Sequence, residues 1–404
     1  MSAEYTATEV LSPLWHVGAA AFFVSLITTP VVRAIAYKTQ VVDRPDDLLK
    51  PHARPIAYLG GVAMCLGMLV GLACHVATMP NLSNVWTRAA ESLTSGRIGD
   101  LLSNSLWQLI SIALATTVIM LVGLIDDIKD ISPGKKVLGQ VVASGILIVG
   151  GVGTRMAYVF LNAAGVGASE WIVIPASCIL CMFVVICTCN ATNLLDGLDG
   201  LCGGVTGIIS LGFLALAVWL AMWNNFPGSD QVRVALCLAV AGAVLGFLPY
   251  NIPPASIFMG DAGSMMLGFF VAAMMAMFCM EGHVRWLLAS GVVFALPIID
   301  TSLAVIRRLR SGKSIFAGDR SHLYDQLVDR GMSVTQVVGL FYLLSIIAAA
   351  LGVTLSIIMR ARHAVIVYLV LLVMIWTVFY KLGMITPDER NRDPEPSDDS
   401  GAQE

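Results

Sequence analysis

Long apolar runs separated by short polar segments are the feature that most constrains this chain. Of its 404 residues, 57% are hydrophobic and only 13% are charged. Soluble domains contain about 25% charged residues, and an apolar run of about 20 residues is long enough for a helix to cross a membrane. A membrane-crossing segment must satisfy its own backbone hydrogen bonds, which a helix does. The sequence therefore predicts an all-α, polytopic helical bundle in a membrane.

Eleven apolar runs are expected to be transmembrane helices, because each is roughly long enough to cross the hydrocarbon layer. They lie near residues 16–37, 56–78, 105–125, 137–153, 171–189, 201–222, 232–250, 264–281, 286–306, 335–358 and 364–382. Residues 1–383 are expected to form one membrane-embedded domain. Residues 384–404 are rich in Asp, Glu, Pro and Ser, a composition that predicts a disordered, acidic cytoplasmic tail.

The distribution of Lys and Arg indicates which ends of these helices face the cytoplasm. If the N-terminus lies outside, the inner segments hold 16 of the 24 Lys and Arg residues. This asymmetry is the one that the positive-inside rule describes. Every polar cluster considered below lies in an inner segment or at its edge. The sequence therefore predicts a functional site on the cytoplasmic face.

Residues 190–200 concentrate amide and carboxylate side chains between two apolar runs. These polar residues recur at intervals of three: Asn190, Asn193, Asp196 and Asp199. Neighbours in this series lie on the same side of a helical or 3₁₀ segment. Oxygen-rich groups beside apolar helices are costly unless they bind something, such as a hard cation or the polar part of a substrate. A polar turn in which Asp199 caps the next helix is the structural alternative.

Asp126 and Asp127 form an acidic pair at the C-terminal end of the predicted span near 105–125. The helix dipole disfavours negative charge there, and adjacent carboxylates also repel each other. Mg²⁺ or a nearby lysine is expected to compensate, unless the pair is simply solvated. Lys136 opens the next predicted span, where a phosphate ligand would relieve the unfavourable dipole and lipid headgroups are the alternative partners.

Asn251, Phe258 and Asp261 lie in one polar segment, residues 251–264. A pair of prolines and two glycines make this segment a rigid loop that another group can approach closely. It presents an amide, an aromatic ring and an acid together. Asp261 has a structural alternative, because an acid at this position also suits a helix N-cap.

The longest inner loop, residues 307–334, contains Arg320 and His322. Arginine suits bidentate contact with phosphate, and histidine suits phosphate contact or proton transfer. Asp300 lies inside the preceding predicted span, where an acid is expected to be functional or to pair with a nearby arginine.

Several classes of activity lack their motifs in this sequence. There is no phosphate-binding P-loop, no haem pattern, no Ser-His-Asp or Cys-His nucleophile arrangement and no nucleic-acid-binding motif. Metal-assisted chemistry on a phosphate-rich soluble substrate at the membrane surface fits best. A secondary transporter whose acids bind a coupling ion is the alternative from another class. Transporter sites usually lie near the bilayer midplane, whereas these acids gather at the ends of spans.

Taken together and in this order, these motifs resemble those of the polyprenyl-phosphate N-acetylhexosamine-1-phosphate transferases of glycosyltransferase family 4. That family transfers a sugar phosphate from a UDP-sugar to a lipid-linked phosphate. The resemblance implies a cytoplasmic active-site cleft, a bacterial plasma membrane, UDP-sugar and polyprenyl phosphate as substrates, and Mg²⁺ as cofactor, with Mn²⁺ as a substitute. A homodimer is one assembly compatible with it.

The resemblance also implies roles for individual residues. The expected catalytic residues are Asp126, Asp127 and Asp196, and the expected metal ligands are Asn193 and Asp261. The expected substrate-binding residues are Asn190, Asp199, Asn251, Phe258, Lys136, Arg320 and His322. Either acid of the 126–127 pair would deprotonate or orient the lipid phosphate, which then expels UMP directly or through a covalent aspartyl intermediate.

The loop that begins at His322 departs from the pattern of the family and argues against one donor. Members that use a muramoyl-pentapeptide donor carry three consecutive histidines there, and those acting on N-acetylglucosamine tend to have His-x-His-His, whereas this chain reads His-Leu-Tyr-Asp and keeps only the first histidine. We therefore expect UDP-N-acetylglucosamine as donor, undecaprenyl phosphate as acceptor, and the first membrane step of a cell-envelope glycan as the role. Tyr324 and Asp325 are candidates for contacting the sugar, unless they only pack the loop. Phospho-N-acetylmuramoyl-pentapeptide transfer, or another UDP-hexosamine, is the alternative.

Overall fold

The computed structural model describes residues 4–44, 55–79, 82–94, 98–223, 229–312, 322–359 and 361–384. The chain is almost entirely helical over these ranges. The helices are α1 (Ala7–Leu11), α2 (Trp15–Thr39), α3 (Gly60–Thr78), α4 (Leu82–Thr94), α5 (Ile98–Leu102), α6 (Ser105–Lys129), α7 (Pro133–Val149), α8 (Met156–Ala163), α9 (Glu170–Leu194), α10 (Leu201–Trp223), α11 (Ser229–Asn251), α12 (Gly260–Cys279), α13 (Val284–Val293), α14 (Ala295–Arg310), α15 (Leu323–Asp329), α16 (Val334–Ile358) and α17 (Ala361–Lys381). The predicted tail from residue 385 onward lies outside the described residues.

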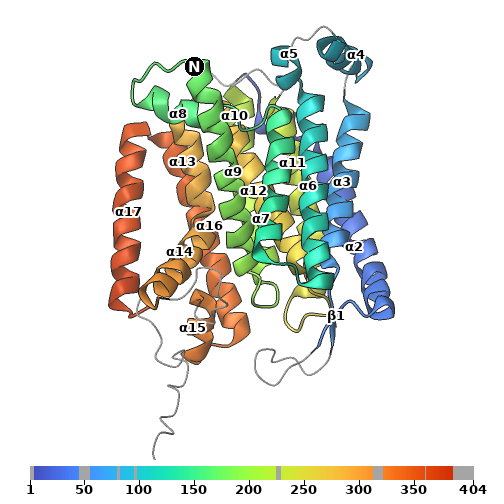
Figure 1. The fold of residues 1–404 in the computed structure, drawn as a ribbon, viewed down its shortest axis with the longest axis vertical. Coiled ribbons are helices and arrows are strands. Elements are labelled where there is room, and N and C mark those ends of the chain that lie inside the picture. The colour runs from blue at the N-terminus through green and yellow to red at the C-terminus, as the bar shows by residue number, and fades with distance from the viewer. Residues whose placement is uncertain are drawn as a thin grey trace, which may run out of the picture.

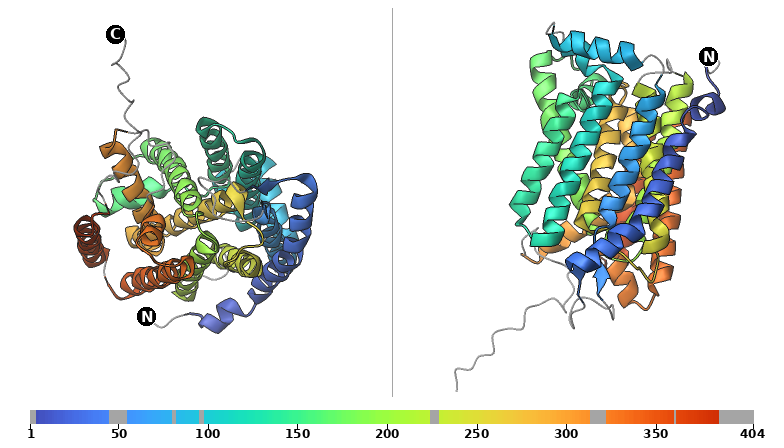
Figure 2. Two further views of the ribbon diagram at one scale, coloured as in Figure 1. Left: turned by 90° about the horizontal axis from the view of Figure 1, so that it is seen from below. Right: turned by 90° about the vertical axis from the view of Figure 1, so that its right-hand side faces the viewer.

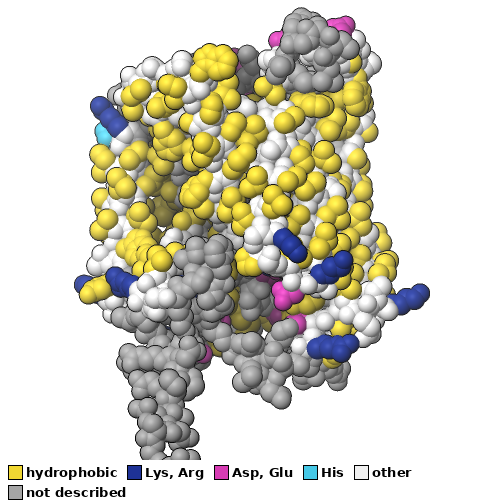
Figure 3. Space-filling view, in the orientation of Figure 1, with side chains coloured by type: hydrophobic (Ala, Val, Ile, Leu, Met, Phe, Trp, Pro, Cys, Tyr) yellow, Lys and Arg dark blue, Asp and Glu magenta, His cyan; other side chains and the backbone are white. Residues whose placement is uncertain are grey.

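The long helices run side by side along the long axis of the molecule (Figure 1). In the described part of the chain, nine helices are long and apolar enough to cross a membrane, and the bent pair α13–α14 makes a tenth if it counts as one span. Hydrophobic side chains cover the flank of the bundle, and most of the Lys and Arg side chains on this face lie toward its lower end (Figure 3). The prediction of an all-α polytopic membrane bundle is confirmed.

Two of the eleven predicted spans differ from their expected form. The span predicted at 137–153 is the shorter helix α7, which has 17 residues. It ends at Val149 because glycines follow, and Gly151 has a φ of 83°, outside the helical region. The span predicted at 286–306 is not one rod, since α13 and α14 meet at an angle of 72°.

Helix α12 forms the centre of the bundle. Its entire apolar window is buried, and it lies near the middle when the molecule is viewed along the helices (Figure 2). Gly61 of α3 and Gly123 of α6 pack against its first turn so closely that an added Cβ would overlap the α12 backbone. Small residues permit such approach between membrane helices. The beginning of α12 is therefore held in place by two neighbouring helices.

Two short strands close one end of the bundle. Strand β1 (Val42–Asp43) pairs antiparallel with β2 (Ile56–Ala57), an element that the sequence did not predict. The Phe258 amide donates to the Ala57 carbonyl at 2.8 Å, so β2 also contacts the loop before α12. This loop therefore has backbone partners on two sides.

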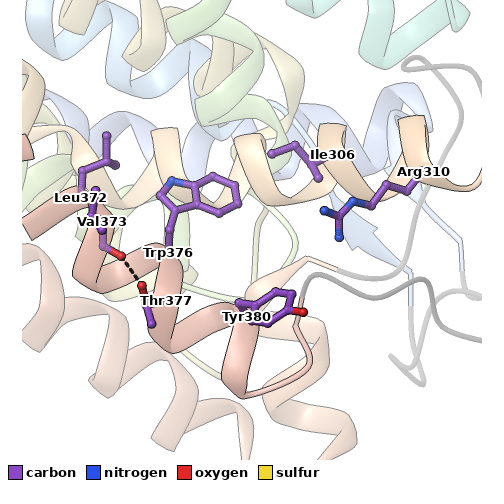
Figure 4. A pocket seen from close by; sticks show the side chains of 7 residues that line it. All are labelled: Ile306, Arg310, Leu372, Val373, Trp376, Thr377 and Tyr380. Atoms are coloured by element: carbon purple, nitrogen blue, oxygen red, sulfur yellow. Dashed lines mark hydrogen bonds between the residues drawn. The ribbon is translucent and has the colours of Figure 1, made fainter.

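A cavity of about 450 Å³ lies between α14 and α17, where Ile306 and Arg310 face Trp376 and Tyr380 (Figure 4). Helix α17 buries only 6% of its apolar window against the rest of the bundle. None of the predicted site residues lines this cavity. The chemistry expected from the sequence is therefore located elsewhere.

A buried charge cluster joins α11 to α12 at the end opposite β1. Arg233 is completely buried, and its guanidinium contacts the carboxylate of Asp230 and, at 2.5 Å, that of Glu281. It also donates to the Met277 carbonyl at 3.1 Å. Removing one partner of a buried ion pair strands the other charge, which is strongly destabilising.

We therefore expect Arg233→Met to lower the free energy of unfolding by about 3–5 kcal/mol. Thermal unfolding in detergent would show this as a lower melting temperature. The matched control is Arg285→Met. It also removes a guanidinium, but one that lies over the Trp286 ring at 4.3 Å and does not belong to the buried charge cluster. Equal melting temperatures for the two variants would contradict a stabilising role for the cluster.

Candidate active site

The carboxylate of Asp127 caps the beginning of α12. Its Oδ1 accepts the Asp261 amide at 2.7 Å, and its Oδ2 accepts the Ala262 amide at 3.1 Å. The first amides of a helix lack intrahelical partners and attract negative charge. Asp261 makes no side-chain cap on this helix. The capping role that the sequence allowed for Asp261 is thus performed by Asp127, a residue of another helix.

Lys136 connects two of the predicted acids. Its Nζ lies 2.5 Å from Asp126 Oδ2 and 2.7 Å from Asp261 Oδ2. Asp126 also accepts the Ile131 amide at 3.0 Å, which fixes the turn between α6 and α7. The sequence predicted that either a lysine or Mg²⁺ compensates the charge of the acidic pair. In the structure Lys136 contacts one of the two acids, Asp126.

Asn193 and Asp261 are direct neighbours. The Asn193 side-chain amide donates to Asp261 Oδ1 at 2.7 Å and to the Ser264 hydroxyl at 3.0 Å. The oxygen and nitrogen of such an amide are assigned from its partners, so a rotated amide would present its oxygen instead. The two predicted metal ligands therefore lie close enough to bind one ion.

Asp196 adds a further negative charge beside these groups. Burial raises the pKa of its carboxyl well above the usual range, and the negative charges of Asp261, Asp127 and Asp199 add to the increase. An excess of carboxylates in one place favours either protonation or a bound cation. A cation bound beside these acids would favour the ionised form of Asp196.

Asp199 and Asn251 hold the polar loops to each other. Asp199 Oδ2 accepts the Ala255 amide at 2.8 Å. The Asn251 side chain accepts the Gly200 amide at 3.2 Å and donates to the Ile257 carbonyl at 3.0 Å. Asn251 is only 3% exposed, so its polar atoms serve the backbone of these loops.

Asn190 lies one turn before Asn193 and faces α7, where its amide donates to Gln140 at 3.2 Å. Phe258 lies beside Tyr58, with ring centroids 5.9 Å apart and a tilt of 54° between the rings. Burial raises the pKa of the Tyr58 hydroxyl, and the negative charge of Asp43 adds to this increase. An aromatic pair of this kind can stack against a planar base.

His322 is attached to a buried acid. Its Nδ1 lies 2.8 Å from Asp300 Oδ2, and the Leu323 amide donates to Asp300 Oδ1 at 2.6 Å. Asp300 is fully buried and His322 is 3% exposed. The intramembrane acid predicted to be functional or paired therefore fixes the beginning of α15. Arg320 falls outside the described residues.

Sequence reasoning missed several partners within the site. Gln140, Ser264 and Tyr58 each contact a predicted site residue; Gln140 and Tyr58 stand outside the polar motifs, and Ser264 ends the polar segment 251–264 without having been assigned a role. Tyr324, considered for sugar contact, donates its hydroxyl to the Leu194 carbonyl at 3.1 Å. Burial raises the pKa of the neighbouring Asp325 carboxyl to about 6. These contacts could have been predicted only with knowledge of which helices are adjacent.

The donor set fits a magnesium ion that is shared with substrate. Over the described residues, no group of three or more His, Cys, Asp or Glu side chains is arranged to hold a metal. Mg²⁺ usually binds one or two carboxylates together with substrate phosphates and water. Asp261 and the Asn193 amide supply such a partial set of ligands. The ammonium of Lys136 contacts Asp261, so positive charge is stable at this carboxylate.

Comparison with known proteins identifies the family of this chain. Residues 109–279 match the model of glycosyl transferase family 4. The decaprenyl-phosphate N-acetylglucosaminephosphotransferase of Mycobacterium tuberculosis (strain ATCC 25618 / H37Rv) is 31% identical over 348 residues, which are 82% of this chain and 80% of the relative. The probable undecaprenyl-phosphate N-acetylglucosaminyl 1-phosphate transferase of Bacillus subtilis (strain 168) is 29% identical over 83% of this chain and 84% of its own length.

A third relative matches a shorter stretch. The phospho-N-acetylmuramoyl-pentapeptide-transferase of Limosilactobacillus fermentum is 39% identical over 191 residues, which are 47% of this chain and 54% of the relative.

The fold is that of a polytopic membrane protein, and the matched family is one of glycosyl transferases. The chain belongs to glycosyl transferase family 4, and over most of its length it is similar to polyprenyl-phosphate N-acetylglucosamine phosphotransferases.

The Asp127 cap leads to a stability prediction. Asp127→Ala should lower the free energy of unfolding by about 1–3 kcal/mol, because two amides of α12 lose a charged acceptor. Asp127→Asn should cost less, since its remaining oxygen can accept one of them. Unfolding in detergent measures both, with the exposed Lys129→Ala as control on the same turn. If Asp127→Ala were as stable as the control, the cap would be unimportant.

Proposed function

We propose that this protein transfers N-acetylglucosamine-1-phosphate from UDP-N-acetylglucosamine to a polyprenyl phosphate, releasing UMP. The observation that carries the proposal is the convergence of Asp126, Lys136, Asn193 and Asp261 at one end of the bundle. Acids, an amide and a lysine from four helices meet there, which suits the recognition of a diphosphate. We place this end on the cytoplasmic side, as the distribution of basic residues indicates.

The reaction requires that one phosphate attack another. An oxygen of the polyprenyl phosphate attacks the β-phosphorus of the UDP-sugar, and the bond from that phosphorus to the bridging oxygen breaks, so that UMP leaves. Lys136 attracts the negative phosphates to the site. Repulsion between the two anions is the main obstacle, so positioning and positive charge supply most of the catalysis.

Asp126 is the better candidate of the acidic pair for orienting or deprotonating the lipid phosphate. Both oxygens of Asp127 accept amides of α12, and breaking these hydrogen bonds would remove the cap of that helix. Asp126 has Lys136 as its charged partner, and a phosphate can compete for the same lysine. Direct attack needs no covalent aspartyl intermediate, because a phosphate oxyanion is already nucleophilic.

Asn193 and Asp261 would hold Mg²⁺, and Mn²⁺ could replace it. When bound, the ion would neutralise charge on the diphosphate as it develops. The chain's own residues hold the two proposed ligands in place. Ser264 would not bind the ion, but its hydroxyl accepts the Asn193 side-chain amide at 3.0 Å. Asp127 holds the α12 turn that carries Asp261.

The donor is inferred from the relatives and from the loop at His322. Relatives that match over four-fifths of this chain are named for N-acetylglucosamine phosphate transfer, whereas relatives named for muramoyl-pentapeptide transfer match 44%, 47% and 69% of it. The absence of the three-histidine run in residues 322–325 agrees with this choice. Muramoyl-pentapeptide transfer is the second candidate, because relatives named for it are 30–39% identical to this chain over the matched residues.

UMP release tests the proposal. The purified protein with polyprenyl phosphate and Mg²⁺ should show a kcat/KM for UDP-N-acetylglucosamine at least about tenfold above that for UDP-N-acetylgalactosamine or the UDP-muramoyl-pentapeptide donor. UMP release should stop when the metal is chelated and when the lipid phosphate is omitted.

Matched variants identify the acid. Asp126→Asn should abolish UMP release, whereas Asp130→Asn, which changes an exposed acid one turn away, should retain it. Preference for the muramoyl-pentapeptide donor would overturn the substrate, and full activity in the presence of chelator would overturn the metal.

A further inference from the structure

Two tyrosine hydroxyls contact the two ends of the segment that carries Asp196 and Asp199. Tyr324 of α15 donates to the Leu194 carbonyl at 3.1 Å. Tyr342 of α16 donates to the Gly200 carbonyl at 2.6 Å. Residues 194–200 are therefore held at both ends by the same C-terminal pair of helices.

Each tyrosine also packs against a glycine, so closely that no side chain fits at the glycine position. A Cβ added at Gly197 would overlap the hydroxyl and ring of Tyr324, and one added at Gly204 would overlap the hydroxyl and ring of Tyr342. The two glycines come from the segment itself and from the first turn of α10. The repeated pairing of a tyrosine with a glycine and a carbonyl indicates a built contact at each end.

The position of Tyr324 is fixed from behind. Its ring stacks on the His322 ring, with centroids 5.4 Å apart and an angle of 5° between the planes. His322 and the Leu323 amide are both bound to the buried Asp300. The Tyr324 hydroxyl is therefore presented to the Leu194 carbonyl by a chain of contacts that begins in α14.

The Leu194 carbonyl needs a partner from outside its own helix. It belongs to the last residue of α9, and the last four carbonyls of a helix have no intrahelical donor. Gly200 ends the polar segment immediately before α10 begins. The two hydroxyls thus fix the points at which the chain leaves one helix and enters the next.

We propose that Tyr324 and Tyr342 are positioning residues, which clamp residues 194–200 so that Asp196 keeps its place near Asp261 and Asp199 keeps its bond to the Ala255 amide. Their effect on catalysis rests on the proposed function, whereas the clamp itself does not. Neither tyrosine has to touch substrate. In this view Tyr324 affects donor binding through the polar segment and does not read the sugar directly.

Hydrogen exchange tests the clamp without any enzymatic activity. Tyr324→Phe and Tyr342→Phe keep each ring and remove only a hydroxyl. Amide exchange in a peptide covering residues 190–204 should become about three- to tenfold faster in each variant, as expected for the loss of one hydrogen bond. The matched control is Tyr250→Phe, which removes a bond from the Tyr250 hydroxyl to the Leu26 carbonyl at 3.1 Å, as long as that of Tyr324. Exchange in this peptide no faster than in the control would overturn the clamp.

Kinetics test whether the clamp positions the donor site. In each tyrosine variant the KM for the UDP-sugar should rise about three- to tenfold while the KM for polyprenyl phosphate changes less than about twofold. The double variant should show about the product of the two effects, because the hydroxyls hold different ends. Faster exchange with unchanged KM for the UDP-sugar would reduce the clamp to a fold contact and overturn the positioning role. A wild-type protein that released no UMP would refute the proposed function, and the exchange result would still decide on the clamp.

Discussion

The contact between the Asp127 carboxylate and the first amides of α12 is the interaction on which the rest of the site depends. It fixes the beginning of the most buried helix against the end of α6. Asp261 lies on the first turn of that helix, so its position relative to Asp126 and Lys136 follows from this cap. The unfavourable charge at the end of α6 is compensated because the same carboxylate faces the favourable end of α12.

The balance of charge explains why the polar cluster is stable at the edge of a membrane bundle and still able to bind a ligand. Lys136 neutralises part of the charge on Asp126 and Asp261, and burial together with the neighbouring carboxylates raises the pKa of Asp196. A divalent cation would relieve the repulsion among these carboxylates, and a diphosphate would bring both further charge and further ligands. Arg233, at the other end of α12, shows the contrasting case of a charge cluster closed among buried side chains.

The sequence was sufficient for the parts of the structure that depend on local composition. Apolar length predicted the membrane helices, and the recurrence of Asn and Asp in residues 190–200 predicted where polar side chains gather. It could not supply contacts between distant segments. Nothing near Asp127 in the sequence indicates that it caps a helix beginning at Gly260. The bend at Phe294 does have a local signal, because Pro297 has no amide to donate to the Val293 carbonyl four residues earlier. Tyr324 looked like a sugar contact because its partner, Leu194, is adjacent only in the folded protein.

The most direct test of a metal site shared between Asp261, Asn193 and a diphosphate is electron paramagnetic resonance of the protein with Mn²⁺ and UDP-N-acetylglucosamine. Bound Mn²⁺ should couple to the ³¹P nuclei of the donor in the wild type. The coupling should be lost in Asp261→Asn and retained in Asp130→Asn, which changes an exposed acid on the same face. Undiminished Mn²⁺ binding and ³¹P coupling in Asp261→Asn would contradict this site.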